Sequence, residues 1–135
     1  MRAPRGIRNN NPGNIERTSV RWKGMAADQS GDPRFIVFTA PEWGIRAIAR
    51  ILLGDWREGQ NTIASLINEW APPHENDTRA YVAAVGRAAG VDPYKPADIP
   101  GLLPKIIAAI VRHENGVQPY RAELIQLGID LERSA

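Results

Sequence analysis

The sequence predicts one mainly α-helical domain that carries a small β-hairpin near its N-terminus. Its 135 residues suit a single domain, which is large enough to bury a hydrophobic core. After residue 40, apolar residues recur with the spacing of amphipathic helices, whereas residues 1–40 are rich in Gly, Asn, Pro and Arg. One short apolar run in that first part, RFIVF at 34–38, has the β-branched and aromatic composition of a strand.

Residues 1–40 are expected to form a loop and hairpin region. The segment NNNPGN at 9–14 is a dense turn signal, because Asn and Gly tolerate left-handed backbone and Pro fixes φ. We expect SVRW at 19–22 to pair with RFIVF as the second hairpin strand, with QSGDP at 29–33 in the connection.

Residues 41–128 are expected to form the helical region. Caps and turn residues separate its helices, with Asp77 or Thr78 at one N-terminus and Gly90 and Gly116 at two C-termini. The expected helices run from 40 to Gly54 or Gly59, over 61–70, 78–89, 102–115 (with Pro104 in its first turn) and 120–127, and Gly128 ends the last one. Residues 129–135 are then a tail.

Glu114 lies on the apolar face of the predicted 102–115 helix. It follows Leu103, Ile107 and Ile110 at spacings of i, i+4, i+7 and i+11, which fall on one side of a helix. A carboxyl group at the edge of an apolar face loses water and keeps its proton more readily. General-acid cleavage of a glycosidic bond needs such a group. A Glu in the last turn of a helix is more often a surface residue, so both roles stay open.

Glu75 is a second candidate acid, because PHENDT at 73–78 repeats letters of RHENG at 112–116. It lies in a turn before a helix N-terminus, where free backbone N–H groups favour an anion and a capping role. It is also a candidate second carboxylate that stabilises positive charge or orients a water. Asp77 has the same two interpretations, and helix capping is favoured for it.

Amide and aromatic side chains suggest a sugar-binding surface. Amides suit sugar hydroxyls and N-acetyl groups, although turn formation explains any single Asn equally well. Trp22 lies in a Gly- and Arg-rich stretch and is expected at a surface that stacks on sugars, whereas Trp70 is expected in the core. The candidate sugar-binding amides are Asn9, Asn10, Asn11 and Asn14.

Several classes of function find no support in the sequence. The absence of cysteine excludes disulfides and thiolate metal sites, and two histidines without HExxH spacing favour no metal. No nucleotide-binding or GxSxG motif occurs, so no cofactor is expected. No stretch reaches the roughly 20 apolar residues of a membrane span, and the N-terminus lacks the apolar core of a secretory signal.

The charge balance points to an anionic partner. The net charge is +2 and the isoelectric point is about 9.3, with the excess of arginine in the N-terminal part. Such a surface suits a cell wall or a nucleic acid. Because no basic helix stands out, we expect no nucleic-acid partner.

Small phage and prophage proteins, described as virion-associated, lysozyme-like peptidoglycan hydrolases, contain segments that resemble this chain. The similar segments are RGIRNNNPGNI, WKG, FIVFTAPEWGIRAIARILL and WAPPHENDTRAYVAAV, and together they cover about residues 5–121. The resemblance implies a lysozyme-like domain that acts on bacterial peptidoglycan, together with other virion proteins as partners. It further implies a location in the virion, or release into the bacterial periplasm.

The order of these segments resembles a circularly permuted lysozyme superfamily domain. In that superfamily, a helix ending in a catalytic Glu precedes the Asn-rich segment, whereas here IIAAIVRHENG comes near the C-terminus. The resemblance then implies that Glu114 is the catalytic acid, that NNNPGNI is a wall of the cleft, and that Tyr81 lines it. No second acid is clearly placed, which favours a single-acid mechanism like that of lytic transglycosylases. A muramidase that uses Glu75 or Asp77 as second carboxylate stays open.

The resulting expectation is an enzyme that cleaves the β-1,4 bond between N-acetylmuramic acid and N-acetylglucosamine. The alternative is a non-catalytic virion structural or wall-binding module with the same fold. A small DNA-binding adaptor is a third and weaker hypothesis, which only the isoelectric point suggests.

Overall fold

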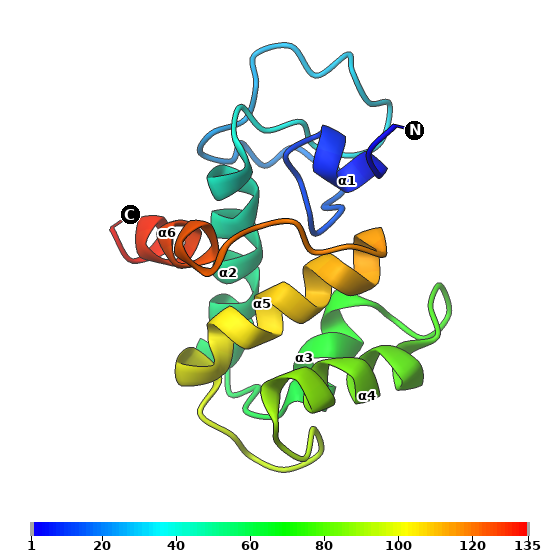
Figure 1. Ribbon diagram of the computed structural model, residues 1–135, viewed down its shortest axis with the longest axis vertical. Helices are drawn as coiled ribbons and strands as arrows, with labels where there is room; N and C mark the ends of the chain where they lie inside the picture. The colour runs from blue at the N-terminus through cyan, green and yellow to red at the C-terminus, as the bar shows by residue number, and fades with distance from the viewer. Residues whose placement is uncertain (1, 135) are drawn as a thin grey trace.

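The computed structural model describes residues 2–134, which form a helical domain (Figure 1). The prediction of a mainly helical chain is confirmed. The described residues contain the helices α1 (Arg5–Arg8), α2 (Pro41–Arg57), α3 (Ile63–Trp70), α4 (Thr78–Ala89), α5 (Ile99–Asn115) and α6 (Ala122–Arg133).

Helix α5 forms the centre of the hydrophobic core. Its side chains Leu103, Ile107 and Ile110 are at most 1% exposed. In Figure 1, α5 crosses the middle of the molecule, between α2 and α6 on one side and α3 and α4 on the other. The helix that carries Glu114 is therefore held by contacts with α2, α4 and α6.

Caps set three of the helix ends as predicted. Asp77 accepts a hydrogen bond from the Ala80 N–H at the start of α4. Gly90 and Gly116 end α4 and α5 in the left-handed conformation, with φ of 75° and 76°. Such backbone favours glycine because it lacks a Cβ atom. Pro104 departs from the prediction, because α5 begins at Ile99 and places this proline inside the helix.

The predicted end of the last helix at Gly128 is wrong, and so is the predicted tail, because α6 continues to Arg133. Gly128 serves close packing instead, since a Cβ atom there would lie 2.5 Å from Cγ2 of Ile45 on α2. Beyond it, the carboxylate of Glu132 is buried against α2 and pairs with Arg50 at 3.3 Å. These contacts keep 129–133 in the helix, and Ala135 lies outside the described residues.

The predicted β-hairpin between 19–22 and 34–38 is absent from the described residues, where only two isolated antiparallel bridges occur. They join Glu16 to Phe35 and Met25 to Phe38. Separate backbone hydrogen bonds, such as those from Ile36 N–H to Ile15 C=O and from Arg17 N–H to Arg34 C=O, occur in place of a regular strand ladder. Polar side chains supply the other partners. Gln29 bonds both the N–H and the C=O of Val37, and Asn11 donates to Ile36 C=O. The N-terminal part is thus an ordered loop region held by isolated backbone hydrogen bonds and by polar side chains.

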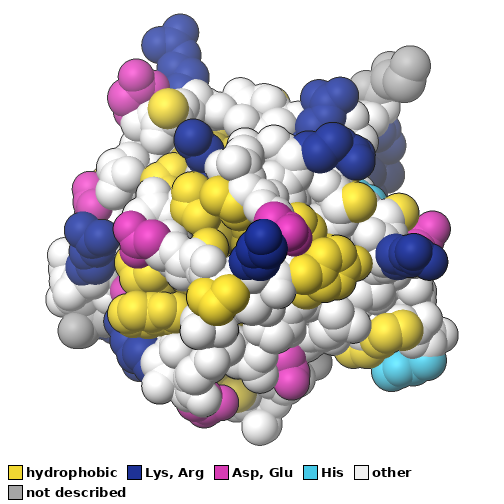
Figure 2. All heavy atoms as spheres, turned by 90° about the horizontal axis from the view of Figure 1, so that it is seen from below, with side chains coloured by type: hydrophobic (Ala, Val, Ile, Leu, Met, Phe, Trp, Pro, Cys, Tyr) yellow, Lys and Arg dark blue, Asp and Glu magenta, His cyan; other side chains and the backbone are white. Residues whose placement is uncertain are grey.

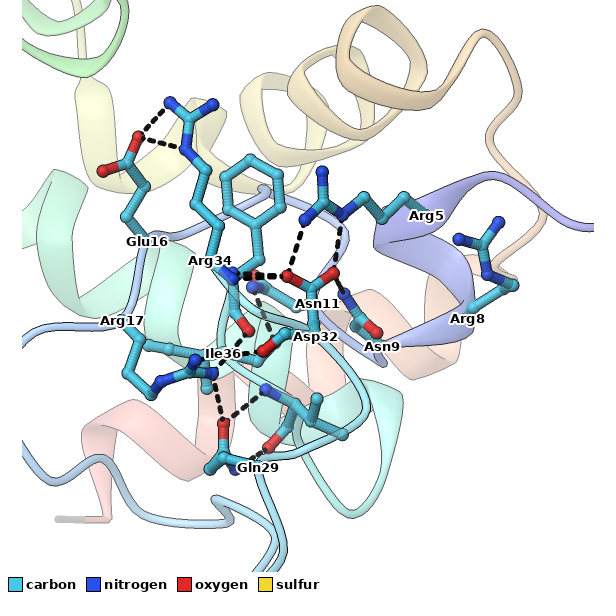
Figure 3. Close-up of polar contacts among 12 residues, drawn as sticks. Arg5, Arg8, Asn9, Asn11, Glu16, Arg17, Gln29, Asp32, Arg34 and Ile36 are labelled. Atoms are coloured by element: carbon cyan, nitrogen blue, oxygen red, sulfur yellow. Dashed lines mark hydrogen bonds and ion pairs between the residues drawn. The ribbon is translucent and has the colours of Figure 1, made fainter.

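Asp32 is the centre of this polar network (Figure 3). Its buried carboxylate accepts from Arg5 Nε at 2.6 Å and Nη2 at 2.7 Å, and from Asn9 Nδ2 at 2.9 Å. The backbone N–H groups of Arg34 and Phe35 also donate to it. The hydrogen bonds from Arg5, above all, hold the pKa of Asp32 well below its usual range, although burial opposes them. This carboxylate ties α1 to the extended segment 34–38.

Charged side chains are spread over the surface. On the face shown in Figure 2, acidic and basic side chains alternate around hydrophobic side chains that lie nearer the middle, and Lys and Arg form no single patch. Among the described helices, none is both long and apolar enough to cross a membrane.

Asp32→Asn is expected to lower the free energy of unfolding by about 2 kcal/mol at pH 7, because Arg5 and two backbone donors lose a charged acceptor. The pKa of Asp32 is lower in the folded protein than in the unfolded chain. Its contribution is therefore present above about pH 4 and is lost as the pH falls below that value. Urea unfolding of wild type and variant at several pH values measures both effects.

The difference between the two proteins should shrink between pH 5 and pH 2, relative to a control such as Asp130→Asn on the exposed side of α6. A stability difference that stays constant over this range would contradict the assigned role of Asp32.

Candidate functional site

An open cleft of about 480 Å³ lies beside the C-terminal end of α5. Its walls come from four parts of the chain: residues 13–16 of the N-terminal loop, 34–35 of the extended segment, 69–71 at the end of α3, and the turn at 75–76. Ile51 of α2 and Glu114 of α5 complete the lining. A cleft that brings together segments so distant in sequence is a natural place for a ligand.

Glu114 is a half-buried side chain held by two neutral donors. Its Oε1 accepts from Asn14 Nδ2 at 3.2 Å, and its Oε2 accepts from the Tyr81 hydroxyl at 2.9 Å. The apolar stripe of α5 aims it inward, since Ile107 and Ile110 on the same face are fully buried. The helical phase of the sequence predicted this direction correctly. Both carboxylate oxygens are thereby oriented in the wall of the cleft.

Asn115 fixes the end of α5 against the N-terminal loop. Its Nδ2 donates to Pro12 C=O at 2.8 Å and to Val111 C=O at 2.9 Å. Gly6 of α1 permits this approach, because a Cβ atom there would lie 2.6 Å from Asn115 Oδ1. Glu114 therefore sits in a rigid junction between α5 and the loop.

Tyr81 was expected to line the cleft, but it is buried and absent from the lining, and it supports Glu114 from α4 instead. Its ring is 1% exposed and stacks on the His113 ring, with centroids 3.8 Å apart. Burial raises the pKa of the Tyr81 hydroxyl far above its usual value, and the nearby charge and hydrogen bond of Glu114 raise it further. The hydroxyl is therefore protonated at neutral pH and donates to the carboxylate.

Asn14 reaches Glu114 from an unusual backbone conformation. Its φ of 51° lies in the left-handed region, which Asn tolerates better than other non-glycine residues. The turn signal NNNPGN thus has a structural reason, and it also places one amide in the cleft.

The other three asparagines of this loop do not line the cleft, contrary to the prediction that they bind sugar. Their amides are used within the fold: Asn9 bonds the Asp32 carboxylate, Asn10 bonds Phe38 C=O, and Asn11 bonds Ile15 and Ile36. Turn and loop formation, the simpler interpretation, holds for these three.

Trp22 is also misplaced by the prediction. It packs on the small cluster of Ile36, Phe38 and Ala47, and it is absent from the lining of the cleft. Trp70 packs against the core as expected, and it also lines the cleft, where its ring leaves no room for a Cβ atom at Gly13. Its position on the apolar stripe did not predict a place in the cleft, because the end of α3 lies beside the cleft only through tertiary packing.

The acids considered in the sequence divide between two places. Glu75 is exposed and lines the cleft, as a second carboxylate would. Asp77 caps α4 and is absent from the cleft lining. The sequence gave no signal for Glu16, Arg34 and Glu69, which also line the cleft, since nothing in their spacing links them to Glu114. No group of three or more potential metal ligands occurs in the described part of the chain.

Similarity to a phage protein agrees with the expected phage relationship. Over 132 residues the chain is 38% identical to Protein P5 of Pseudoalteromonas phage PM2. The chain belongs to the family of this phage protein. The aligned region covers 95% of this chain and 81% of Protein P5. No model of a known protein family matches the chain, and the lysozyme-like activity stays a prediction.

Substitutions of Asn14 should separate its backbone role from its side-chain role. Asn14→Gly keeps the left-handed conformation at little cost, whereas Asn14→Ala adds strain of about 1 kcal/mol. Both variants lose the hydrogen bond to Glu114. Urea unfolding should therefore find Asn14→Ala less stable than Asn14→Gly by about 1 kcal/mol. Equal stabilities would show that residue 14 does not adopt this conformation.

Proposed function

We propose that the protein cleaves peptidoglycan glycan strands at the β-1,4 bond between N-acetylmuramic acid and N-acetylglucosamine. The observation that carries this proposal is Glu114 in the cleft wall, with its carboxylate oriented by Asn14 and Tyr81. A positioned, half-buried carboxyl group next to an open groove is what general-acid cleavage of a glycosidic bond requires.

Glu114 acts first as acid and then as base. In its protonated form it donates its proton to the glycosidic oxygen, and the bond from that oxygen to the anomeric carbon breaks. The ionised Glu114 then takes a proton either from the C6 hydroxyl of the same sugar or from a water. The oxygen so activated bonds to the anomeric carbon, which gives a 1,6-anhydro sugar in the first case and a hydrolysed end in the second.

The intramolecular route is the favoured one, because it needs a single acid. Asp77 is occupied by capping α4, which removes it as a second carboxylate. Glu75 is the candidate for that role in the hydrolytic route, since it lines the same cleft. In this role it would orient the attacking water or stabilise positive charge at the anomeric carbon.

The chain order supports a circularly permuted lysozyme-like arrangement. In such an arrangement the Glu-bearing helix must end beside the Asn-rich segment, although here Asn14 and Glu114 are 100 positions apart in the sequence. The bonds from Asn14 to Glu114 and from Asn115 to Pro12 meet this requirement. The phage relative supports a role in the virion or in the periplasm of an infected bacterium, where peptidoglycan is the barrier.

Glu114→Gln is expected to lower the rate of peptidoglycan cleavage by about 10²- to 10⁴-fold, because the amide cannot donate a proton as an acid. The measurement is the loss of turbidity of purified cell walls. Glu123→Gln, which alters an exposed acid on α6 away from the cleft, is the matched control and should keep wild-type activity.

An inactive wild type on several wall types would instead favour a non-catalytic wall-binding or structural module. A fully active Glu114→Gln would keep the enzyme but reject Glu114 as its acid.

The products distinguish the two chemical routes. Mass spectrometry of fragments released by the wild type should find 1,6-anhydro ends, which are one water lighter than hydrolysed ends. Glu75→Gln should then retain most of the activity, since the intramolecular route does not use this residue. Hydrolysed ends together with a large loss in Glu75→Gln would establish the muramidase route.

A further inference from the structure

Acidic side chains dominate the lining of the cleft. Glu16, Glu69, Glu75 and Glu114 come from four different segments, and Arg34 is the basic residue that the described lining contains. A cleft of this charge repels an anionic ligand unless a cation receives its negative groups. Peptidoglycan is an anionic ligand, unlike neutral glycans, because its muramic acid units carry peptides that end in carboxylates.

Arg34 is anchored at its backbone and open at its side chain. Its N–H donates to Asp32 at 2.8 Å, and its guanidinium lies over the Phe35 ring, 5.0 Å from the centroid. The side chain is nevertheless 58% exposed. The Asp32 network therefore fixes the backbone of Arg34, while its guanidinium group stays accessible from the cleft.

The pairing of Arg34 with Glu16 leaves donors unused (Figure 3). Both Nε and Nη2 bond the same oxygen, Oε1 of Glu16, so the pair is not a two-oxygen fork. Nη1 makes no hydrogen bond within the described residues. Because the Glu16 side chain is 54% exposed, water screens this pair and a ligand carboxylate can compete for it. A guanidinium binds carboxylates well, since its planar donors match two oxygens.

We propose that Arg34 is a specificity-determining residue that binds a carboxylate of the peptide side chains of peptidoglycan, with Glu16 holding it in place in the free protein. This inference rests on the proposed function. It assigns to Arg34 the discrimination between peptide-bearing glycan and neutral glycan, and it assigns no part of the bond cleavage to this residue.

The test compares Arg34→Gln with wild type on native peptidoglycan and on the same material with its carboxylates amidated. On native material KM should rise about tenfold while kcat changes little, because the lost contact is made equally in the ground state and the transition state. On amidated material the two proteins should have the same KM. Arg21→Gln, which alters an exposed arginine outside the cleft, should match wild type on both.

Equal losses on both materials, or no loss on either, would overturn the proposal. A second measurement keeps it separate from the catalytic proposal: the affinity of Glu114→Gln, with and without Arg34→Gln, for soluble peptidoglycan fragments. Weaker binding confined to carboxylate-bearing fragments supports Arg34 even if the wild type cleaves nothing. Unchanged affinity, or no binding by either protein, overturns the assignment.

Discussion

The end of α5 is held against the N-terminal loop by side-chain amides, and the candidate site depends on this junction. Asn115 donates to Pro12 C=O, and Asn14 donates back to Glu114. Each bond joins residues about a hundred positions apart in the sequence, so it forms only when the whole domain has folded. The junction gives Glu114 a fixed orientation, because each of its two carboxylate oxygens accepts a hydrogen bond.

Polar side chains and separate backbone hydrogen bonds hold the described part of the N-terminal region, in place of a regular sheet. The backbone groups of 34–38 bond the side chains of Asp32, Gln29 and Asn11 and separate backbone groups of residues 9, 15, 17 and 26, rather than one partner strand. A stable loop requires such partners, because an unpaired buried backbone group costs free energy. The same network positions Arg34 at the cleft, so the structure of the loop and the charge of the site are linked through Asp32.

Much of the helical framework could be predicted because it follows from local rules. Apolar spacing gave the stripe of α5 and the direction of Glu114, and cap residues such as Asp77 and Gly90 marked helix ends. The hairpin was a wrong prediction, because 34–38 bonds backbone groups of residues 15, 17 and 26 and nearby polar side chains instead of 19–22. Composition does not show which of these partners a segment finds. The prediction that Gly128 ends the last helix was wrong for a related reason. The packing of α6 on Ile45 requires glycine inside the helix, and the local sequence does not encode this packing.

The site was predictable only in part. Periodicity placed Glu114 and the resemblance to lysozyme-like phage proteins placed Asn14 at the cleft, whereas Tyr81, expected in the lining, is buried behind Glu114. The distinction between Asn14, which faces the cleft, and Asn9, Asn10 and Asn11, which do not, depends on tertiary contacts. The presence of Arg34 and Glu69 in the cleft could not be predicted for the same reason, since each comes from a segment with no motif of its own.

The most direct test of this account is nuclear magnetic resonance of isotopically labelled Glu114→Gln protein with soluble glycan strands of peptidoglycan. The side-chain amide of Asn14 and the indole of Trp70 line the cleft and should shift as the glycan is added. The indole of Trp22, which lies outside the lining, should not shift. Shifts confined to residues away from the cleft, or none at saturating glycan, would contradict the account.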